Sequence, residues 1–230
     1  MTTRDVIRAT PRTRIIGLDL GTEPFSFTAG QAILVAPHGA PLRKPYSIAC
    51  SPKQAAESHT LELLVQIDAP DADDPHLERL TPGRLVDVEG PLGSFGLPPA
   101  DERDILFVAG GTGIAPLRSM LWDAIEHRPQ TKLTLIYSVR SSDEIAYEDE
   151  FRNVAGSGRL DFRVTITRSG PESWLGPRGR INDALIQHVI RTPQTHCIVC
   201  GPRAMITDVV ALLTAAGVPD DLILTETFSS

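Results

Sequence analysis

Short apolar runs separated by turn-forming residues fill the first 98 positions of the chain. The runs are rich in Val, Ile and Leu, and the turns include Pro37-His38-Gly39 and Thr81-Pro82-Gly83. Short strands at this spacing predict a small antiparallel barrel. The expected strands cover residues 6–7, 14–20, 32–36, 46–49, 61–67 and 85–88. One helix is expected at 74–80, with Asp74 as its N-cap and Pro75 as its first residue.

The pattern changes after a proline-rich polar joint at residues 97–102. The continuous apolar run at 105–109 is typical of a strand buried on both faces. Strands and helices then alternate, which predicts a doubly wound parallel sheet with helices on both faces. The expected strands are 105–109, 133–139, 162–167, 197–200 and 222–225, and the expected helices are 114–127, 143–154, 181–190 and 203–216.

Composition narrows the class of protein. The 230 residues carry 22 Lys and Arg against 29 Asp and Glu, a net charge of −7, which argues against a general nucleic-acid binder. Three cysteines predict no disulfide framework and cannot supply the four thiolates of a fused iron–sulfur cluster. No apolar segment has the length of a signal peptide or a membrane span, so we expect a cytoplasmic protein that does not bind membranes.

A glycine-rich turn joins the first buried strand of the second half to the following helix. Gly110-Gly111-Thr112-Gly113 allows a sharp turn and a close approach of the backbone to a ligand. The amide groups at the start of the helix favour a phosphate. The spacing is not G-x-G-x-x-G, so a purely structural strand-to-helix turn stays open as the alternative.

Two cysteines stand three residues apart, as in many metal and redox motifs. Cys197 and Cys200 fall on a predicted strand, where residues three apart point to opposite faces. The six histidines show no metal-ligand spacing, so we expect no metal site. Cys200 alone ends its strand just before Gly201-Pro202, where ligands of parallel sheets bind.

Lys44-Pro45-Tyr46-Ser47 brings a cation, an aromatic ring and a hydroxyl together within four residues. These groups suit a phosphate, a planar ring and a polar ring atom. Alternation along a strand puts Lys44 and Tyr46 on one face and Ser47 on the other. A structural edge strand explains the segment equally well.

Five motifs in order resemble the ferredoxin–NADP⁺ reductase superfamily over residues 5–228. They are Lys44-Pro45-Tyr46-Ser47, Gly90-Pro91-Leu92-Gly93, Gly110 to Pro116, Cys200-Gly201-Pro202 and Glu226-Thr227-Phe228. The resemblance implies a flavin-binding domain at 1–100, an antiparallel six-stranded Greek-key β-barrel. It also implies an NAD(P)-binding α/β domain at 101–230, a doubly wound parallel sheet, with FAD at the interface.

The resemblance also implies roles for individual residues. Tyr46 would stack on the isoalloxazine, and the Ser47 hydroxyl would bond near the hydride-accepting N5. Cys200 and Glu226 would lie beside the nicotinamide, and Phe228 would lie near the other flavin face. Ser47, Cys200 and Glu226 are thus the expected catalytic residues. The other expected cofactor-binding residues are Arg43, Lys44, Ile48, Val65, Gln66, Gly90, Gly93, Ser94, Gly110, Gly111, Thr112, Gly113, Arg140, Thr167, Arg168, Arg180 and Gly201.

The choice of cofactors depends on two segments. Thr167-Arg168 follows the third strand, where NADPH-specific members place Ser-Arg, and Arg140 and Arg180 add charge there. This favours NADPH and leaves NADH open. Residues 71–75 are acidic where FAD-binding members have Gly and Ser or Thr, and acidic groups repel a pyrophosphate. FAD is therefore expected to bind differently or weakly, with FMN or a free flavin as alternatives.

The resemblance predicts a flavin-dependent NAD(P)H oxidoreductase. It would pass a hydride to bound FAD, and electrons would then leave to a separate ferredoxin, flavodoxin or oxygenase component. A basic strip would steer an acidic acceptor toward it. The strip comprises Arg4, Arg8, Arg12, Arg14, Arg43 and Lys44. Two alternatives stay open: a reductase that uses free flavin as substrate, and a non-catalytic nucleotide-sensing or assembly subunit.

Overall fold

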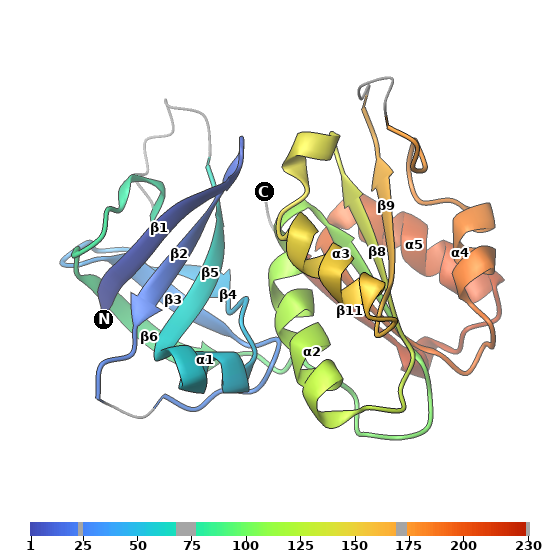
Figure 1. Cartoon of the computed structure of the whole chain (residues 1–230), viewed down its shortest axis with the longest axis horizontal. Helices are drawn as coiled ribbons and strands as arrows, with labels where there is room; N and C mark the ends of the chain where they lie inside the picture. Colours follow the sequence, from blue (N-terminus) through green and yellow to red (C-terminus); the bar gives the residue numbers. More distant parts are fainter. Residues whose placement is uncertain (23–24, 68–76, 169–173, 229–230) are drawn as a thin grey trace.

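The computed structural model describes residues 1–22, 25–67, 77–168 and 174–228. An N-terminal β region and a C-terminal α/β region lie side by side, with helix α2 (Ile114–His127) against the β region (Figure 1). The expected boundary at residue 100 falls between the last strand of the first region and the first strand of the second, and it stays a prediction. None of the described helices is long and apolar enough to cross a bilayer.

The N-terminal region is built from two antiparallel three-stranded sheets, ordered β1-β2-β5 and β4-β3-β6. Single bridges, Thr2 to Leu85 and Ile48 to Leu63, connect the two sheets, and this confirms the predicted barrel-like arrangement. Apolar residues from both sheets fill the interior, among them Ile16, Ile33 and Leu63. The strands are β1 (Thr2–Thr10), β2 (Thr13–Asp19), β3 (Ala32–Pro37), β4 (Lys44–Ser47), β5 (Thr60–Gln66) and β6 (Val86–Leu92).

The barrel differs from the sequence expectation at two elements. Strand β1 is nine residues long instead of two, because its outward positions carry polar side chains that hide it from an apolar pattern. Helix α1 (Pro52–Ser58) was not predicted, although Ser51 and Gln54 form a capping box and Pro52 begins the helix. Of the helix expected at 74–80, the described part is the 3₁₀ turn η1 (Leu77–Arg79), and Asp74 lies outside the described residues.

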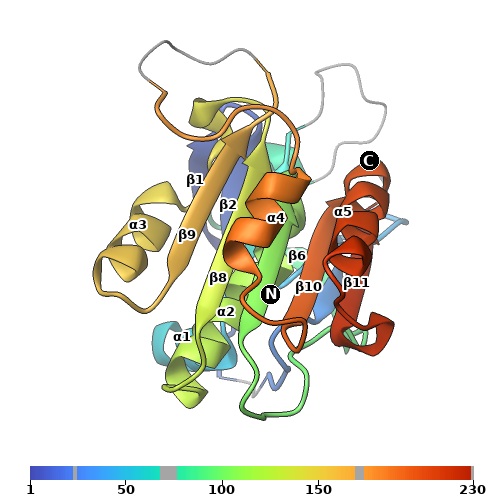
Figure 2. The same ribbon diagram turned by 90° about the vertical axis from the view of Figure 1, so that its right-hand side faces the viewer.

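The C-terminal region is a five-stranded parallel sheet in the order β11-β10-β7-β8-β9, as the alternating pattern predicted. Helices α2 and α3 (Glu148–Gly156) cover one face, and α4 (Asp183–Val189) and α5 (Arg203–Ala215) cover the other (Figures 1 and 2). The strands are β7 (Ile105–Gly110), β8 (Leu133–Val139), β9 (Asp161–Ile166), β10 (His196–Pro202) and β11 (Ile223–Phe228).

The single helix expected at 143–154 is wrong. The structure has a short 3₁₀ turn, η3 (Ser142–Glu144), then an interruption before α3 begins at Glu148. Ile145 and Ala146 are drawn into the core, and Tyr147 takes a left-handed conformation with φ 59°. Burying these side chains outweighs the continuity of the helix, which the helical spacing of the apolar residues suggested.

Candidate active site

The glycine-rich turn lies at the carboxyl edge of the parallel sheet. Gly110 ends β7, the 3₁₀ turn η2 (Gly111–Gly113) follows with Thr112 in its middle, and α2 begins at once. Gly111 has φ 55°, and a Cβ there would meet no atom within 4 Å, so a ligand can approach its backbone. At Gly113 a Cβ would lie 2.3 Å from the carbonyl oxygen of Cys200. Only glycine lets α2 start this close to the end of β10.

Tyr137 on β8 holds this turn from below. Its hydroxyl donates a hydrogen bond of 3.1 Å to the carbonyl oxygen of Gly111. The ring is fully buried, and burial raises the pKa of Tyr137 well above its usual range, so the hydroxyl keeps its proton. Sequence reasoning missed this residue, because an aromatic side chain in a buried strand looks like a core residue.

Cys200 and Glu226 are direct neighbours in the parallel register of β10 and β11. Cys200 is fully buried, and burial, reinforced by the nearby Glu226 charge, raises the pKa of its thiol well above the usual range. Burial also raises the pKa of the partly buried Glu226. Phe228 pairs with Pro202, beyond Gly201, and packs against the core beneath the turn. The Cys200 thiol is therefore neutral at pH 7 and is no metal ligand or nucleophile.

Cys197 lies on the opposite face of the same strand. It packs in the core under α4 and α5, whereas Cys200 packs in the core under α2 and α3. The two thiols therefore cannot bind one ion, as the strand alternation predicted.

Three arginines lie near the carboxyl ends of β8 and β9. The Arg168 amide donates to the carbonyl oxygen of Arg140 at 2.9 Å, and the neighbouring Thr167 amide donates to Val139. The segment leading to Arg180 runs beside β9, and the Arg180 guanidinium is 3.2 Å from Asp208 on α5. Arg140 and Arg168 are thus brought together by main-chain contacts, while Arg180 has a carboxylate partner.

The barrel presents Lys44, Tyr46 and Ser47 along β4. Lys44 and Tyr46 are half-buried, and Ser47 is 5% exposed. The Ser47 hydroxyl makes no hydrogen bond with any other residue that the structure describes. Ile48 and Val65 are buried in the barrel interior, so only their main chain can face a cofactor.

The remaining barrel residues surround the same end of this sheet. Ala32 on β3 pairs with Ser47 on one side and with Leu92 on the other. The expected residues nearby are Gly90 in β6, Gly93 and Ser94 after β6, exposed Gln66 at the end of β5, and Arg43, which is 3.6 Å from Glu89.

These groups fit a flavin. A partly accessible aromatic ring, a cation and a buried hydroxyl open to a new partner lie on one strand, and the barrel strand β5 contacts the glycine turn of the nucleotide region. The acidic segment 71–75, expected to influence the pyrophosphate, lies outside the described residues.

Comparison with known proteins agrees with this geometry. Residues 107–211 match the family described as an oxidoreductase NAD-binding domain. The chain is 35% identical over 193 residues to ferredoxin–NADP reductase B of Sorangium cellulosum, an alignment that covers 80% of this chain and 77% of that protein. The chain belongs to the ferredoxin–NADP⁺ reductase family. It is therefore an oxidoreductase of the ferredoxin–NADP⁺ reductase type.

Some similar proteins extend well beyond the region that matches this family member. It is 30% identical over 204 residues to one component of the Na⁺-translocating NADH-quinone reductase of Klebsiella pneumoniae, and it spans about half (49%) of that component. The crystal structure of the Amycolatopsis cytochrome P450 reductase GcoB superposes with a TM-score of 0.87 at 27% identity, covering 100% of this chain and 69% of that one. A Neisseria gonorrhoeae ferredoxin NADP⁺ reductase with bound FAD and NADP has the same fold, with a TM-score of 0.78 at 22% identity, covering 98% and 96%.

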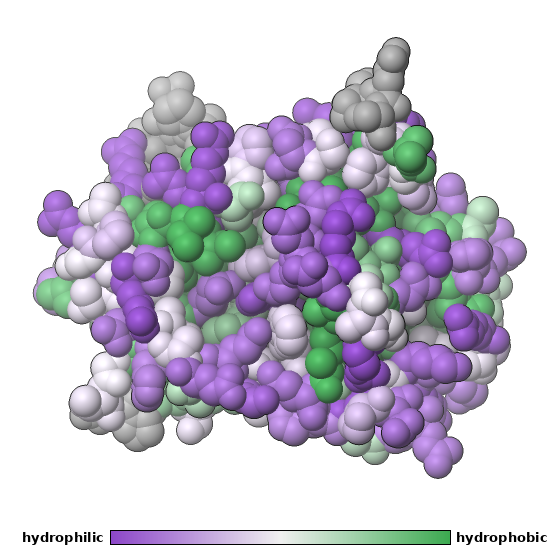
Figure 3. Space-filling view, viewed as in Figure 1, coloured by the Kyte–Doolittle hydropathy of each residue, from purple (hydrophilic) through white to green (hydrophobic). Residues whose placement is uncertain are grey.

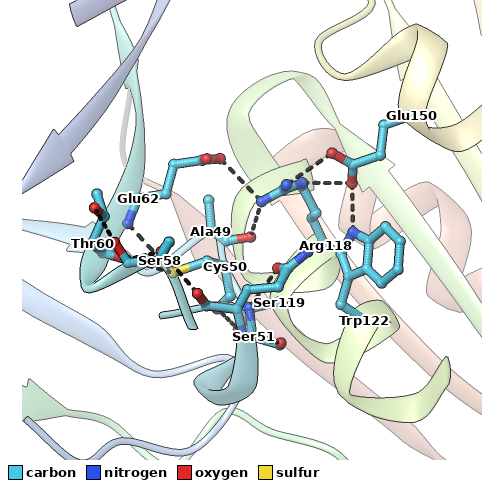
Figure 4. A network of polar contacts seen from close by, with 11 residues as sticks. Ala49, Cys50, Ser51, Ser58, Thr60, Glu62, Arg118, Ser119, Trp122 and Glu150 are labelled. Carbon is cyan, nitrogen blue, oxygen red and sulfur yellow. Dashed lines mark hydrogen bonds and ion pairs between the residues drawn. The ribbon is translucent and has the colours of Figure 1, made fainter. Parts of the chain in front are cut away.

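A polar network between the barrel and α2 was also missed by sequence reasoning. At its centre Arg118 on α2 is 6% exposed and contacts groups from the barrel and from α3 (Figure 4). One signal could have found it: Arg118 shares the apolar face of its helix with Ile114 and Leu121, and a charge there needs partners.

Proposed function

We propose that this chain takes a hydride from NAD(P)H onto bound FAD and passes the electrons to a separate acceptor. The observation that carries the proposal is the meeting of the two sites. The glycine turn, Cys200 and Glu226 lie at one edge of the sheet, and barrel strand β5 contacts that turn. A flavin bound on β4 would supply the hydride acceptor and the electron donor for the next protein.

The side chains of this site act by positioning. Amide groups of the Gly110–Gly113 turn would bind the nucleotide phosphates, with Tyr137 fixing the turn through the Gly111 carbonyl. The Ser47 hydroxyl would orient the flavin edge, and neutral Cys200 with half-buried Glu226 would shape the nicotinamide pocket. Phe228 would cover the site until the nicotinamide enters. Alignment rather than proton transfer would set the rate.

The preferred nucleotide in this proposal is NADPH. Arg140 and Arg168 are joined through their main chains, so their guanidinium groups leave neighbouring backbone positions where a 2′-phosphate could be bound. Arg180 contributes less in this proposal, because Asp208 already balances its charge.

The proposed acceptor is an acidic electron-transfer protein or oxygenase component. The named relatives include a ferredoxin–NADP reductase and a cytochrome P450 reductase. Strand β1 carries exposed Arg4 and Arg8 on either side of Ile7, and an apolar area over β1 interrupts the hydrophilic face in Figure 3. Basic groups around an apolar centre would steer and then hold such a partner.

Nucleotide oxidation with an artificial acceptor tests this function. The protein is loaded with FAD, freed of excess, and given NADPH or NADH with ferricyanide, which accepts single electrons. We expect ferricyanide reduction by the loaded protein, none after the flavin is removed, and a lower KM for NADPH. Turnover only with excess flavin would favour the free-flavin reductase, and nucleotide binding without turnover would favour the non-catalytic subunit.

A further inference from the structure

The interdomain network is organised around one side chain. The Arg118 guanidinium donates two hydrogen bonds to Glu150 of α3, at 2.7 and 2.8 Å, and a third of 3.0 Å to Glu62 of β5. A fourth, of 2.7 Å, goes to the carbonyl oxygen of Ala49 in the barrel. Its charge also lies 4.3 Å from the centre of the Tyr147 ring. Figure 4 shows the barrel groups on one side of Arg118 and Glu150 on the other.

The position of these contacts along the chain is specific. Arg118 lies one helical turn after Ile114, where α2 leaves the glycine turn. Its barrel acceptor, Ala49, lies two residues after Ser47. The next helix residue, Ser119, donates a 2.6 Å hydrogen bond to the carbonyl oxygen of Cys50. One turn of one helix therefore connects the nucleotide cradle to the strand that carries Ser47.

We propose that Arg118 is a positioning residue for hydride transfer: it fixes the distance between the nucleotide site at the start of α2 and the flavin site on β4. This inference rests on the proposed function. A rigid linkage matters because hydride transfer needs reacting atoms about 3–3.5 Å apart, and a misplacement of about 1 Å can cost 10²-fold in rate.

The chemistry of the network suits this role better than simple adhesion. An apolar side chain would also seal the interface, but dispersion contacts allow sliding, whereas a guanidinium fork binds its partners in a fixed direction. Trp122, one turn further along α2, donates a 2.5 Å hydrogen bond to Glu150 and so orients the carboxylate that Arg118 binds. Buried ion pairs of this kind contribute more to specificity than to stability.

Variants must separate positioning from folding. Arg118→Lys keeps the charge and loses the fork, and Ser119→Ala removes only the neighbouring hydrogen bond. Replacing Arg118 alone by an apolar residue would strand two carboxylates, so the combined variant Arg118→Met, Glu62→Gln, Glu150→Gln removes the charges together. Arg152→Gln is the matched control, because Arg152 pairs with Glu148 within α3 and does not reach the barrel.

The first measurement needs no cofactor. Spin labels attached at Ala56→Cys on α1 and Asn153→Cys on α3 report the distance between the two regions, and the three natural cysteines are buried and less accessible to the label. We expect a broader distance distribution in the Arg118→Lys and combined variants and an unchanged one in Arg152→Gln.

The second measurement is hydride transfer at saturating nucleotide in FAD-loaded protein, followed anaerobically by stopped flow. We expect transfer slower by about 10- to 100-fold in the Arg118 variants, with the Kd values for FAD and NADPH changed less than threefold. Ser119→Ala should show a smaller loss in the same direction, and Arg152→Gln none.

The outcomes separate the two hypotheses. An unchanged distance distribution and an unchanged rate, with only a lower melting temperature, would overturn the positioning role and leave Arg118 a structural residue. If Arg118→Lys does not fold, the combined variant and Ser119→Ala decide. If the natural protein itself transfers no hydride from either nucleotide, the proposed function fails, and positioning for hydride transfer fails with it. The label distances then report only whether Arg118 holds the two regions together.

Discussion

The Ser47 hydroxyl is the residue-scale feature most closely tied to the proposed chemistry. It is buried on β4 and makes no hydrogen bond with another described residue, so a flavin edge can take it as a partner. We expect Ser47→Ala to slow flavin reduction by about tenfold while the Kd for FAD stays within about threefold, because one orienting hydrogen bond is lost. Stopped-flow reduction by NADPH measures this, and an unchanged rate would contradict the role.

The two cysteines of β10 provide an internal comparison. Cys200 faces the site and Cys197 faces away from it, in the core under α4 and α5. We expect Cys200→Ala to lower kcat by about tenfold, because the nicotinamide pocket loses its wall, and Cys197→Ala to leave kcat unchanged. Equal losses in both variants would mean that the thiols act only through stability, which thermal unfolding of both proteins would reveal.

Tyr137 connects the strand core to the nucleotide turn. Removing its hydroxyl in Tyr137→Phe leaves the Gly111 carbonyl oxygen without this donor and loosens the turn. We expect the Kd for NADPH to rise by about fivefold, close to 1 kcal/mol, with little change in FAD binding. Isothermal titration of both ligands tests this. A rise in the FAD Kd alone would show that the turn does not serve the nucleotide.

At the scale of elements, apolar periodicity predicted every strand of the parallel sheet and helices α2, α4 and α5 to within a few residues. These elements bury a regular face, and the pattern of that face is visible in the sequence. Helix α1 was missed because its signal lies in the cap, Ser51 with Gln54, rather than in apolar spacing. The false continuity at Tyr147 arose because tertiary burial of Ile145 and Ala146 overrides local helical preference.

The opposite end of the sheet from the site carries a pH-sensitive contact. The Asp101 carboxylate accepts a 2.9 Å hydrogen bond from His196 and also pairs with Arg103. Partial desolvation alone would raise the pKa of Asp101, but these hydrogen bonds outweigh it and lower the pKa to about 2.

This contact predicts how stability depends on pH. Since the folded-state pKa is depressed, the contribution is present above the unfolded pKa of about 3.9 and is lost as pH falls toward 2. We expect Asp101→Asn to lower the unfolding free energy by about 1 kcal/mol at pH 6 and by less at pH 2.5. Urea titrations at both pH values test this. A loss that is equal at both would contradict the assignment.

At the scale of the whole molecule, what the sequence could not predict is what joins the two regions. Arg118 and Glu62 lie 56 positions apart, and Arg118 and Glu150 lie 32 apart. Local periodicity holds no information on contacts of this kind. The five motifs indicated which segments belong to a site, but only the fold brings the β4 strand and the α2 helix together through Ala49 and Cys50.

The visible spectrum of the FAD-loaded protein under anaerobic conditions, before and after NADPH, tests the central claim most directly. It follows the hydride from the nucleotide site to the flavin site without any external acceptor. Bleaching of the flavin bands by stoichiometric NADPH, and more slowly by NADH, is the result this account predicts. Flavin that stays bound and yellow with both nucleotides present at saturation would contradict it.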